Sequence, residues 1–443
     1  MASTQGSFVK QSLVEKAMAF AWEEATGIGD HITWDSNAAK KIGAVNNTGD
    51  TVTIRRPGRI SGTVSDLSAD TSLPDNTQPA VGYQAMTDAT LPLTVSVKIE
   101  ANVNASMKEL TLDLTRQDAY ERFIKPAIVD LKDKASVEIA KLVAAYTGQA
   151  FVPDTSTYTN YHQQVINVLG AAEAQMIQRK GMTESGKKIA LLHMGVYPKL
   201  APGASSQFNA GYNPEAMQNS GKLQPMLGGF NLFRSPVLDS VNIVGSSTLT
   251  NAKVAAPSGG VTNGLTTWAQ TWSLNVKGFA NSTTYPKGFK IALTGINWTM
   301  PTTGASLGST VTFSLAAAAT TDGSGNATFV LTEPLVYSGP YKNVDIATAV
   351  PTDTVITAVG ASTNASIVKP CYVFDPSAIV GVSPEVKVPS GVDSSRMIRS
   401  RNGFNFAIVE DHFPTTLQSV TKLVGFLGIA VQKPEGVGVI YGL

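Results

Sequence analysis

The sequence contains one cysteine, Cys371, among 443 residues, and only 15% of its residues are charged. A single cysteine excludes an intrachain disulfide and a metal site built from several thiolates, and it fits a reducing compartment. The charged fraction is well below the roughly 25% of typical soluble proteins. The net charge of +1 argues against a nucleic-acid-binding protein, which needs a clustered basic face. A surface poor in charge instead suits large contacts with other protein chains.

The sequence also has few residues suited to catalysis or metal binding. No two of its four histidines lie within ten residues of each other, and none stands in a metal-binding motif: His31, His162, His193 and His412. The charges of Glu410–His412 suggest an acid–base cluster less readily than the end of a strand. Asp322–Asn326 faintly resembles a calcium loop but lacks the glycine required at position 6, and Glu333 at position 12 is followed by Pro334 in a predicted strand, which favours a hairpin turn. We therefore predict no catalytic residue, no metal site and no cofactor.

The first part of the chain predicts an amphipathic helix. Residues 8–26 place apolar side chains at helical spacing, with charged residues between them. Those charges argue against a signal peptide. No run of 18 apolar residues occurs in the sequence, so no membrane span is predicted.

Two segments with alternating apolar and polar residues, 46–60 and 91–104, predict a pair of strands. The long polar stretch between them predicts a hairpin with an extended loop. A two-stranded hairpin is marginally stable alone, so it needs a surface to lie on. An ordinary hairpin inside a sheet and an arm that lies on a neighbouring subunit both fit this pattern.

The strongest helical pattern covers residues 109–146, and a second helix is predicted at 162–180. The first would be about 50 Å long if continuous, with a kink or a new start at Pro126 and an end at Gly148. One face of it collects the following apolar residues: Ala119, Phe123, Ile128, Leu131, Ala135, Ile139, Leu142 and Tyr146. Further strands are predicted at 187–194, 405–413 and 426–443.

Residues 245–370 differ from the rest of the chain in composition and in the pattern of their apolar residues. They contain short runs rich in Thr, Val and Ser, separated by turn signals, which is typical of a small antiparallel barrel or sandwich. Residues 251–320 contain no Asp or Glu. Residues 235–245 and 372–386 on either side predict strand and helix of another domain. The β module is therefore predicted to be an insertion.

Four stretches, in this order, carry a resemblance to a known family. They are Gly221–Pro236 with its glycine-hinged turn, Lys287–Ile296 with two glycines, Thr328–Pro334, and the Lys-Pro-Glu-Gly-Val-Gly-Val run of 433–439. With the order of predicted elements, they resemble the tailed-bacteriophage major capsid proteins of the Hong Kong 97-like (HK97-like) fold. The resemblance is greatest to the P22-type coat proteins, which carry an inserted β domain, and it covers about three quarters of the chain. The first 50 residues match only in pattern.

This resemblance implies an α+β, HK97-like capsid fold with an inserted antiparallel β-barrel domain. The implied parts are an N-terminal arm at 1–45, an E-loop hairpin at 46–106, a P-domain spine helix with the first part of the A-domain at 107–244, the inserted β-barrel at 245–370, and the returning A-domain and P-domain strands at 371–443. The implied function is self-assembly into pentamers and hexamers of an icosahedral shell around phage double-stranded DNA.

The resemblance also implies location and partners. The chain would be part of the virion capsid, assembled in the cytoplasm of the host bacterium. A scaffolding protein and a portal protein are the implied partners, and a decoration protein is a further candidate. The packaged DNA would be contacted without sequence specificity, and no membrane would be involved.

Candidate site residues follow from the same resemblance. Two arginine clusters are hypothesised to pair with neighbouring subunits: Arg55, Arg56, Arg59, Arg396, Arg399 and Arg401. In the A-domain turn, Gly228 and Gly229 would supply backbone angles that other residues avoid, and Phe230, Leu232 and Phe233 would be buried. One departure concerns residues 245–285, whose only charges are Lys253 and Lys277. Salt bridges between capsomers through this stretch are therefore doubtful.

Two other functions were weighed against a capsid protein. A β-rich adhesin or tail-associated protein would explain residues 245–370 but has no need of the long helix. A hydrolase would need a polar constellation that four scattered histidines do not supply.

Overall fold

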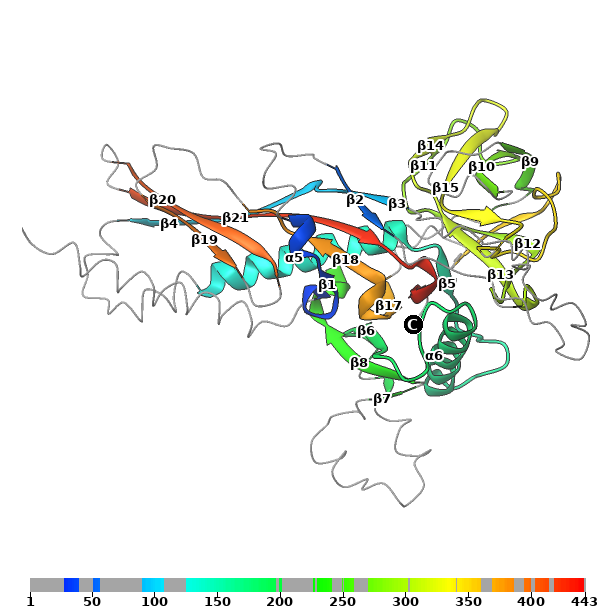
Figure 1. The fold of residues 1–443 in the computed structure, drawn as a ribbon, viewed down its shortest axis with the longest axis horizontal. Coiled ribbons are helices and arrows are strands. Elements are labelled where there is room, and N and C mark those ends of the chain that lie inside the picture. Colours follow the sequence, from blue (N-terminus) through cyan, green and yellow to red (C-terminus); the bar gives the residue numbers. More distant parts are fainter. Residues whose placement is uncertain are drawn as a thin grey trace, which may run out of the picture.

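A computed structural model describes residues 28–39, 51–55, 90–106, 125–196, 199–200, 226–227, 229–240, 249, 251–258, 270–301, 303–339, 341–359, 369–385, 394–399, 403–413 and 418–441. The predicted helix at 8–26 lies outside these residues. The described chain combines two α-helices of more than four turns with many strands, so it is of the mixed α+β class. Figure 1 shows a long sheet and helix α5 side by side, with residues 251–359 gathered at one end.

Helix α5, Lys125–Tyr146, is the axis of the fold. Ile128, Leu131, Ala135 and Ile139 recur every three or four residues and are all at most 3% exposed. Such spacing lines one face of a helix, which agrees with the apolar face predicted from the sequence. Pro126 is the second residue of the described helix, a position that tolerates its missing N–H.

One six-stranded sheet lies between the two helices, in the order β5-β22-β17-β6-β8-β7. Its strands are β5 Gln149–Phe151, β6 Ile189–His193, β7 Met226–Leu227, β8 Phe230–Ser235, β17 Cys371–Phe374 and β22 Val437–Ile440, and the second helix, α6, spans Tyr161–Gln178. Alternate residues face opposite ways: Leu191 and Phe374 pack with α5, whereas Leu192 and Val373 pack with α6. Because both faces are covered, the central strands β6, β17 and β22 are buried along their whole length and almost entirely apolar.

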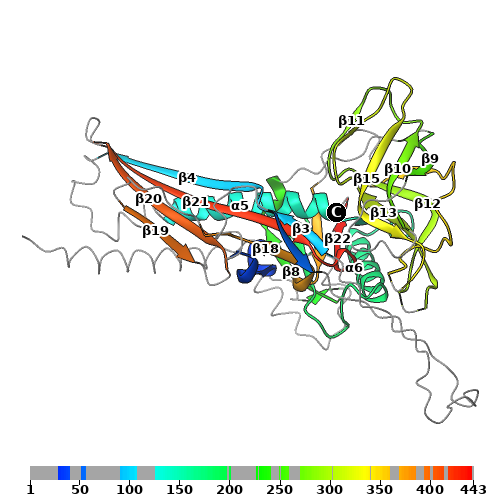
Figure 2. The ribbon, with the colours of Figure 1, turned by 45° about the horizontal axis from the view of Figure 1, so that its top comes forward.

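The second six-stranded sheet is built around the long strand β21, Gln418–Val431. Its other strands are β1 Thr33–Trp34, β4 Val97–Ser106, β18 Ile379–Val382, β19 Ser394–Arg399 and β20 Asn405–Phe413. The first half of β21 pairs with β4 and β20, and its last residues pair with β18. Figure 2 shows this sheet running along α5, and Ile99 and Leu423 are buried in the same cluster as the helix.

The predicted hairpin is only half correct. Strand β2, Thr51–Arg55, pairs with β3, Thr90–Thr94, as expected. The second predicted strand does not continue along β2, because from Val97 onward it pairs with β21 instead. The change of partner occurs where Val95 is buried and where the backbone of Thr94 approaches Gly428 closely. Packing against another part of the chain thus divides a segment that looks like one strand in the sequence.

The predicted β character of residues 245–370 is confirmed. Its strands are β9 Lys253–Ser258, β10 Gln270–Lys277, β11 Thr284–Tyr285, β12 Lys290–Thr299, β13 Ser306–Ser314, β14 Ala319–Thr320, β15 Ala327–Val336 and β16 Ile356–Ala358. They surround a separate core that includes Leu274, Trp298, Phe313 and Phe329.

A closed barrel is not found among the described residues of this segment. The strands form three small sheets, β15-β10-β9, β11-β14 and β13-β12-β16. Register shifts interrupt β10 and β12, as bulges do when they end a ladder. Only isolated bridges, Lys253 with Val355 and Leu315 with Leu331, connect the edges of the larger two sheets.

The remaining short elements are 3₁₀ turns: η1 Ile28–His31, η3 Pro236–Ser240, η4 Pro376–Ala378 and η5 Pro434–Gly436. The chain leaves the first sheet after β8 and returns to it at β17, and β6 lies between these two strands. The strands of 245–370 belong to other sheets. A segment inserted into a domain must begin and end at neighbouring places in that domain, and the chain does so here at β8 and β17.

Candidate functional site at the joint between residues 245–370 and the helices

The catalytic candidates of the sequence are not brought together. His31 lies in η1, His162 in α6, His193 in β6 and His412 in β20. Across the described ranges, no group of three or more His, Cys, Asp or Glu residues could hold a metal ion. No helix within those ranges is both long and apolar enough to cross a membrane.

Residues 322–326 form a hairpin turn held by their own side chains. Asp322 Oδ1 accepts hydrogen bonds from the backbone N–H groups of Ser324 (2.8 Å) and Asn326 (2.9 Å), and Oδ2 accepts one from Asn326 Nδ2 (3.0 Å). These bonds favour the carboxylate and lower the pKa of Asp322. Both carboxylate oxygens serve the turn, which agrees with the hairpin interpretation.

The glycine-hinged turn before β8 is explained in part by the structure. Gly229 has φ +79, and a Cβ at this position would overlap the carboxylate of Glu173, which pairs with Lys188. Both the backbone angle and the space therefore require glycine. Phe230 is fully buried, in agreement with the sequence analysis.

The sequence predicted that Phe233 is buried, and in the single subunit this is wrong. Phe233 is 39% exposed and lies against His31, with 4.2 Å between ring centroids. Strand β8 lies toward the edge of its sheet, where only the two-residue β7 follows, so fewer side chains cover its outer residues. Gly228 lies outside the described residues.

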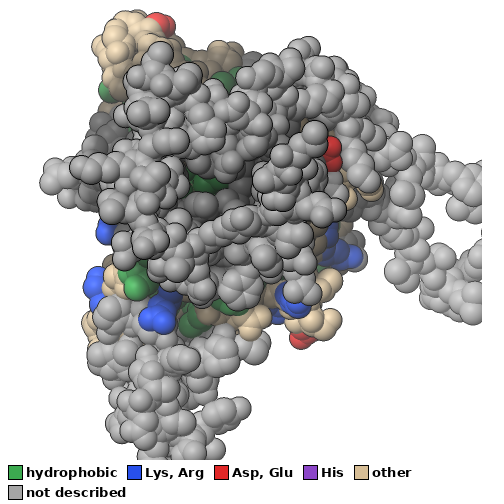
Figure 3. Space-filling model, turned by 90° about the vertical axis from the view of Figure 1, so that its left-hand side faces the viewer, with side chains coloured by type: hydrophobic (Ala, Val, Ile, Leu, Met, Phe, Trp, Pro, Cys, Tyr) green, Lys and Arg blue, Asp and Glu red, His purple; other side chains and the backbone are tan. Residues whose placement is uncertain are grey.

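The two arginine clusters lie on strands or outside the described chain. Arg55 ends β2, Arg396 and Arg399 belong to β19, and Arg56, Arg59 and Arg401 lie outside the described residues. Figure 3 views the molecule from the end of the long sheet, and the basic side chains coloured in it are scattered rather than joined in one patch. The inter-subunit role of the arginines stays a prediction.

The contacts that hold residues 245–370 to the helices, here called the joint, have two parts. The first is at the C-terminal end of α5. Lys290, the first residue of β12, is 2% exposed and donates hydrogen bonds to the carbonyl oxygens of Ala144 (3.0 Å) and Thr147 and to Ser314 Oγ. The last carbonyls of a helix have no partner within the helix, so an N–H donor from another part of the chain can satisfy them. Lys290 therefore caps α5 from outside.

Close backbone packing surrounds this cap. Gly288 has φ +84, and a Cβ there would lie 2.9 Å from the Cα of Ala145. The backbone N–H of Ala150, the middle residue of β5, donates to Thr312 Oγ1 at 3.1 Å. At the rim, Lys287 Nζ lies 4.3 Å from the ring centre of Tyr146. The segment therefore fits closely over the turn that joins α5 to β5.

The second part of the joint is a buried ion pair at the end of α6. Arg179, the residue that follows α6, extends to Glu333 on β15, with 3.1 Å between Nη2 and Oε1. The side chains of Arg179 and Glu333 are only 1% and 4% exposed. The guanidinium also lies 3.6 Å from the ring centre of Trp298 on β12. An arginine between a carboxylate and an indole face satisfies its charge without water.

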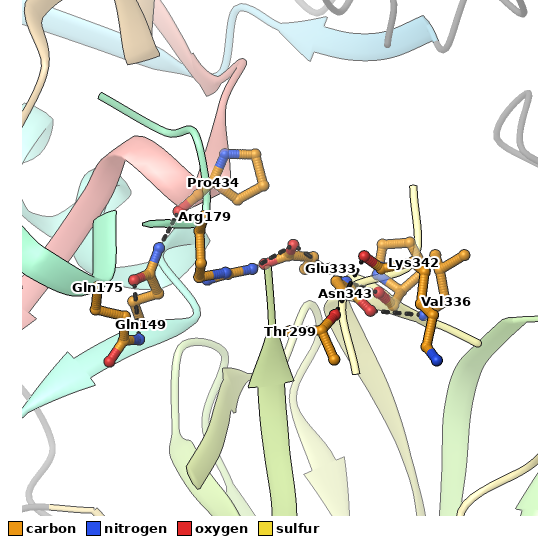
Figure 4. A network of polar contacts seen from close by, with 10 residues as sticks. Gln149, Gln175, Arg179, Thr299, Glu333, Val336, Lys342, Asn343 and Pro434 are labelled. Atoms are coloured by element: carbon orange, nitrogen blue, oxygen red, sulfur yellow. Dashed lines mark hydrogen bonds and ion pairs between the residues drawn. The ribbon is translucent and has the colours of Figure 1, made fainter. Parts of the chain in front are cut away.

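Further polar contacts lie on both sides of this pair (Figure 4). Inside the segment, Asn343 Nδ2 donates to Glu333 Oε1 (3.4 Å) and to the carbonyl of Pro334 (2.8 Å). On the helix side, Gln149 Nε2 donates to the carbonyl of Pro434 (3.0 Å), next to the turn after α6. Because buried polar groups need partners, this network fixes one relative position of the two parts.

Sequence reasoning missed the roles of Lys290, Arg179 and Glu333. A signal for Lys290 was present, since it interrupts the apolar run Phe289–Leu293 at a position that a buried strand would give to an apolar residue. Arg179 and Glu333 are 154 residues apart, and no local pattern connects them. Both Lys290 and Glu333 lie within stretches that carried the resemblance to capsid proteins.

A family model described as "P22 coat protein - gene protein 5" matches residues 44–439. No curated protein sequence matches the chain.

Several solved phage structures align with most of the chain at low identity. The capsid of Ralstonia phage GP4 has 8% identity and a TM-score of 0.44, covering 93% of this chain and 86% of that one. The capsid of cyanophage P-SCSP1u has 11% identity and a TM-score of 0.42, with 95% and 89% coverage. A structure titled Mycobacterium phage Che8 has 10% identity and a TM-score of 0.41, with 94% and 91% coverage.

Proposed function

The chain belongs to the P22 coat protein family and is a major capsid protein, and from this we propose that its copies assemble as pentamers and hexamers of an icosahedral shell around double-stranded DNA. The observation that carries the proposal is the family match over residues 44–439. Low charge supports it, because charged residues are depleted at the centres of protein interfaces. A shell of many copies needs only moderate contacts between each pair of subunits.

We further propose the HK97-like arrangement for this subunit. Its parts would be the N-terminal arm at 1–45, the E-loop at 46–106, the spine helix and first A-domain part at 107–244, the inserted β-barrel at 245–370 and the return at 371–443. The departure from and return to one sheet, at β8 and β17, support an insertion. The two bridges between small sheets support a barrel whose strands are joined at a few points only.

The inserted segment makes little use of charge on its surface. Asp322 is held by its own turn, Glu333 by Arg179, and Asp353 by Lys277 at 2.7 Å. We therefore infer that this segment stabilises the subunit through the joint and contacts neighbours mainly through neutral groups. Exposed Val330 (40%) on β15 agrees with such contacts.

The two arginine clusters are the proposed charged contacts between subunits. Replacing Arg55, Arg56 and Arg59 together with Ala should weaken assembled shells, because exposed pairs of about 0–1 kcal/mol each recur in every subunit. The melting temperature of the free subunit should stay unchanged. If the free subunit itself loses stability, these arginines belong to its internal fold.

Assembly partners are part of the same proposal. A scaffolding protein would bind the subunit in a precursor shell, a portal protein would occupy one vertex, and a decoration protein is a further candidate. The assembly is proposed to occur in the cytoplasm of the host bacterium, without a membrane.

Negative-stain electron microscopy of the purified protein tests the proposal. Expression with and without neighbouring gene products should give closed shells, tubes or six-membered rings in at least one condition. Shells formed only with a neighbouring product would identify the need for a scaffold. A uniform monomer or trimer under every condition would contradict assembly.

A further inference from the structure

Lys290 is a buried amine whose recorded partners are all neutral. Its Nζ contacts two backbone carbonyls, of Ala144 and Thr147, and the hydroxyl of Ser314. Ser314 Oγ also donates to the carbonyl of Thr147. The other fully covered basic side chain of the joint, Arg179, has a carboxylate partner. The two anchors of the joint therefore differ: one is an ion pair and the other is a lysine among neutral oxygens.

Burial without a counter-ion disfavours the charged form of an amine. The pKa of Lys290 is lowered from 10.5 to about 7, and burial is the cause. A neutral amine retains two N–H groups, which can still donate to the carbonyls at the end of α5. The neutral form of Lys290 can therefore hold the joint closed. Once the joint opens and water reaches the amine, it is charged below about pH 10.

The charged and titratable groups around Lys290 lie at the edges of the joint. On α5, Tyr146 faces Lys287, whose Nζ is 3.2 Å from the phenol oxygen. On β15, Glu333 approaches Gly148 but is paired with Arg179 from the end of α6. The strands that pair with β12, namely β13 and β16, contribute only uncharged residues opposite its first four positions. None of these elements supplies an unshared carboxylate to the lysine.

We propose that Lys290 makes the joint a one-proton latch, in which the neutral amine closes residues 245–370 against α5 and opening the joint is coupled to its protonation. This goes beyond shell formation, since it concerns how the two parts of one subunit separate. The contact of Gly288 with Ala145 and the bond between Ala150 and Thr312 open together with it.

The coupling has a definite sign and size. Between the folded pKa near 7 and the unfolded value of 10.5, the open state binds one proton more than the closed state. Each unit of falling pH therefore raises the opening equilibrium constant by up to about tenfold. Below about pH 7 both states are protonated and the effect levels off. Lower pH loosens the joint, and higher pH tightens it.

The test compares the full-length wild type with Lys290→Met in urea unfolding at pH 7, 8 and 9. The unfolding equilibrium constant of the wild type, divided by that of the variant, should rise about fiftyfold between pH 9 and pH 7, because the closed state is itself half protonated at pH 7. Lys287→Met is the matched control, because it removes an exposed lysine at the same helix end. Its curve should follow the wild type at every pH.

A second variant, Lys290→Gln, keeps two N–H donors and does not titrate. It should fold, and its stability, like that of Lys290→Met, should lack the pH dependence expected of the wild type. Parallel pH curves for the wild type and both variants would overturn the latch. Failure of both neutral variants to fold would overturn it too, since a neutral side chain should close the joint. None of these outcomes depends on whether shells assemble.

Discussion

Removing one member of the Arg179–Glu333 pair should destabilise the subunit strongly. Both side chains are almost completely excluded from water, and their closest atoms are 3.1 Å apart. The change Glu333→Gln removes the carboxylate charge 3.1 Å from the buried guanidinium, and Arg179→Met removes the guanidinium from the buried carboxylate of Glu333. Loss of one partner of a buried pair costs roughly 3–5 kcal/mol, because the remaining charge is uncompensated.

The double variant, Arg179→Met with Glu333→Gln, distinguishes pairing from simple packing. Once both charges are absent, no uncompensated charge remains, so the double variant should cost less than the sum of the single ones. The expected difference is about 2 kcal/mol or more, at the upper part of the range for residues in contact. The free energies of unfolding can be measured in urea by tryptophan fluorescence, since the ring of Trp298 lies against the guanidinium of Arg179.

The matched control is the exposed pair of Lys141 and Glu138 on α5, with 2.6 Å between its atoms. Lys141→Met should change stability by less than about 1 kcal/mol, because water screens such pairs. If Glu333→Gln costs no more than this control, the joint is open to water and the reasoning is refuted. If the single variants add up in the double variant, the two charges do not stabilise each other.

Three further predictions concern glycines and the inserted segment. Gly229→Ala should destabilise the subunit by roughly 1–3 kcal/mol and displace Glu173 from Lys188. The control Gly295→Ala has a similar φ of +82 but no atom within 4 Å of the added Cβ, so it should show the backbone cost alone. Equal losses of stability in thermal unfolding would argue against the overlap with Glu173. Gly181→Ala should be strongly destabilising, because a Cβ there would overlap the backbone of Glu435. Its control, Gly170→Ala within α6, has free space around the added Cβ and should stabilise the subunit by up to about 1 kcal/mol. A Gly181→Ala variant more stable than the wild type would show that the turn can move. Replacing residues 250–365 by a short linker should leave a folded but aggregation-prone remnant, since Arg179 and the end of α5 lose their cover; an unfolded remnant by circular dichroism would show that the segment is not a separate domain.

The predictions from sequence were best where periodicity reports burial directly. Helix α5 follows its apolar face, and the short strands of 245–370 follow their Thr- and Val-rich runs between turns. They failed where a distant part of the chain decides the outcome. The strand predicted at 91–104 changes its partner near Val95 because β21 offers a longer edge, and Phe233 is exposed because its sheet ends beside it.

By itself, the sequence determined the mixed α+β class, the order of the elements and the resemblance to capsid proteins, because these depend on local patterns and composition. Only the tertiary structure showed which charges hold the subunit together. Lys290 only interrupts an apolar run, Glu333 looks like an ordinary strand residue, and Arg179 looks like the end of a helix. Their roles arise because the chain leaves one sheet and folds separately before it returns. Folding then places the amine of Lys290 at the end of α5 and buries an ion pair at the end of α6. Pairing over such separations is set by packing, which local periodicity does not encode.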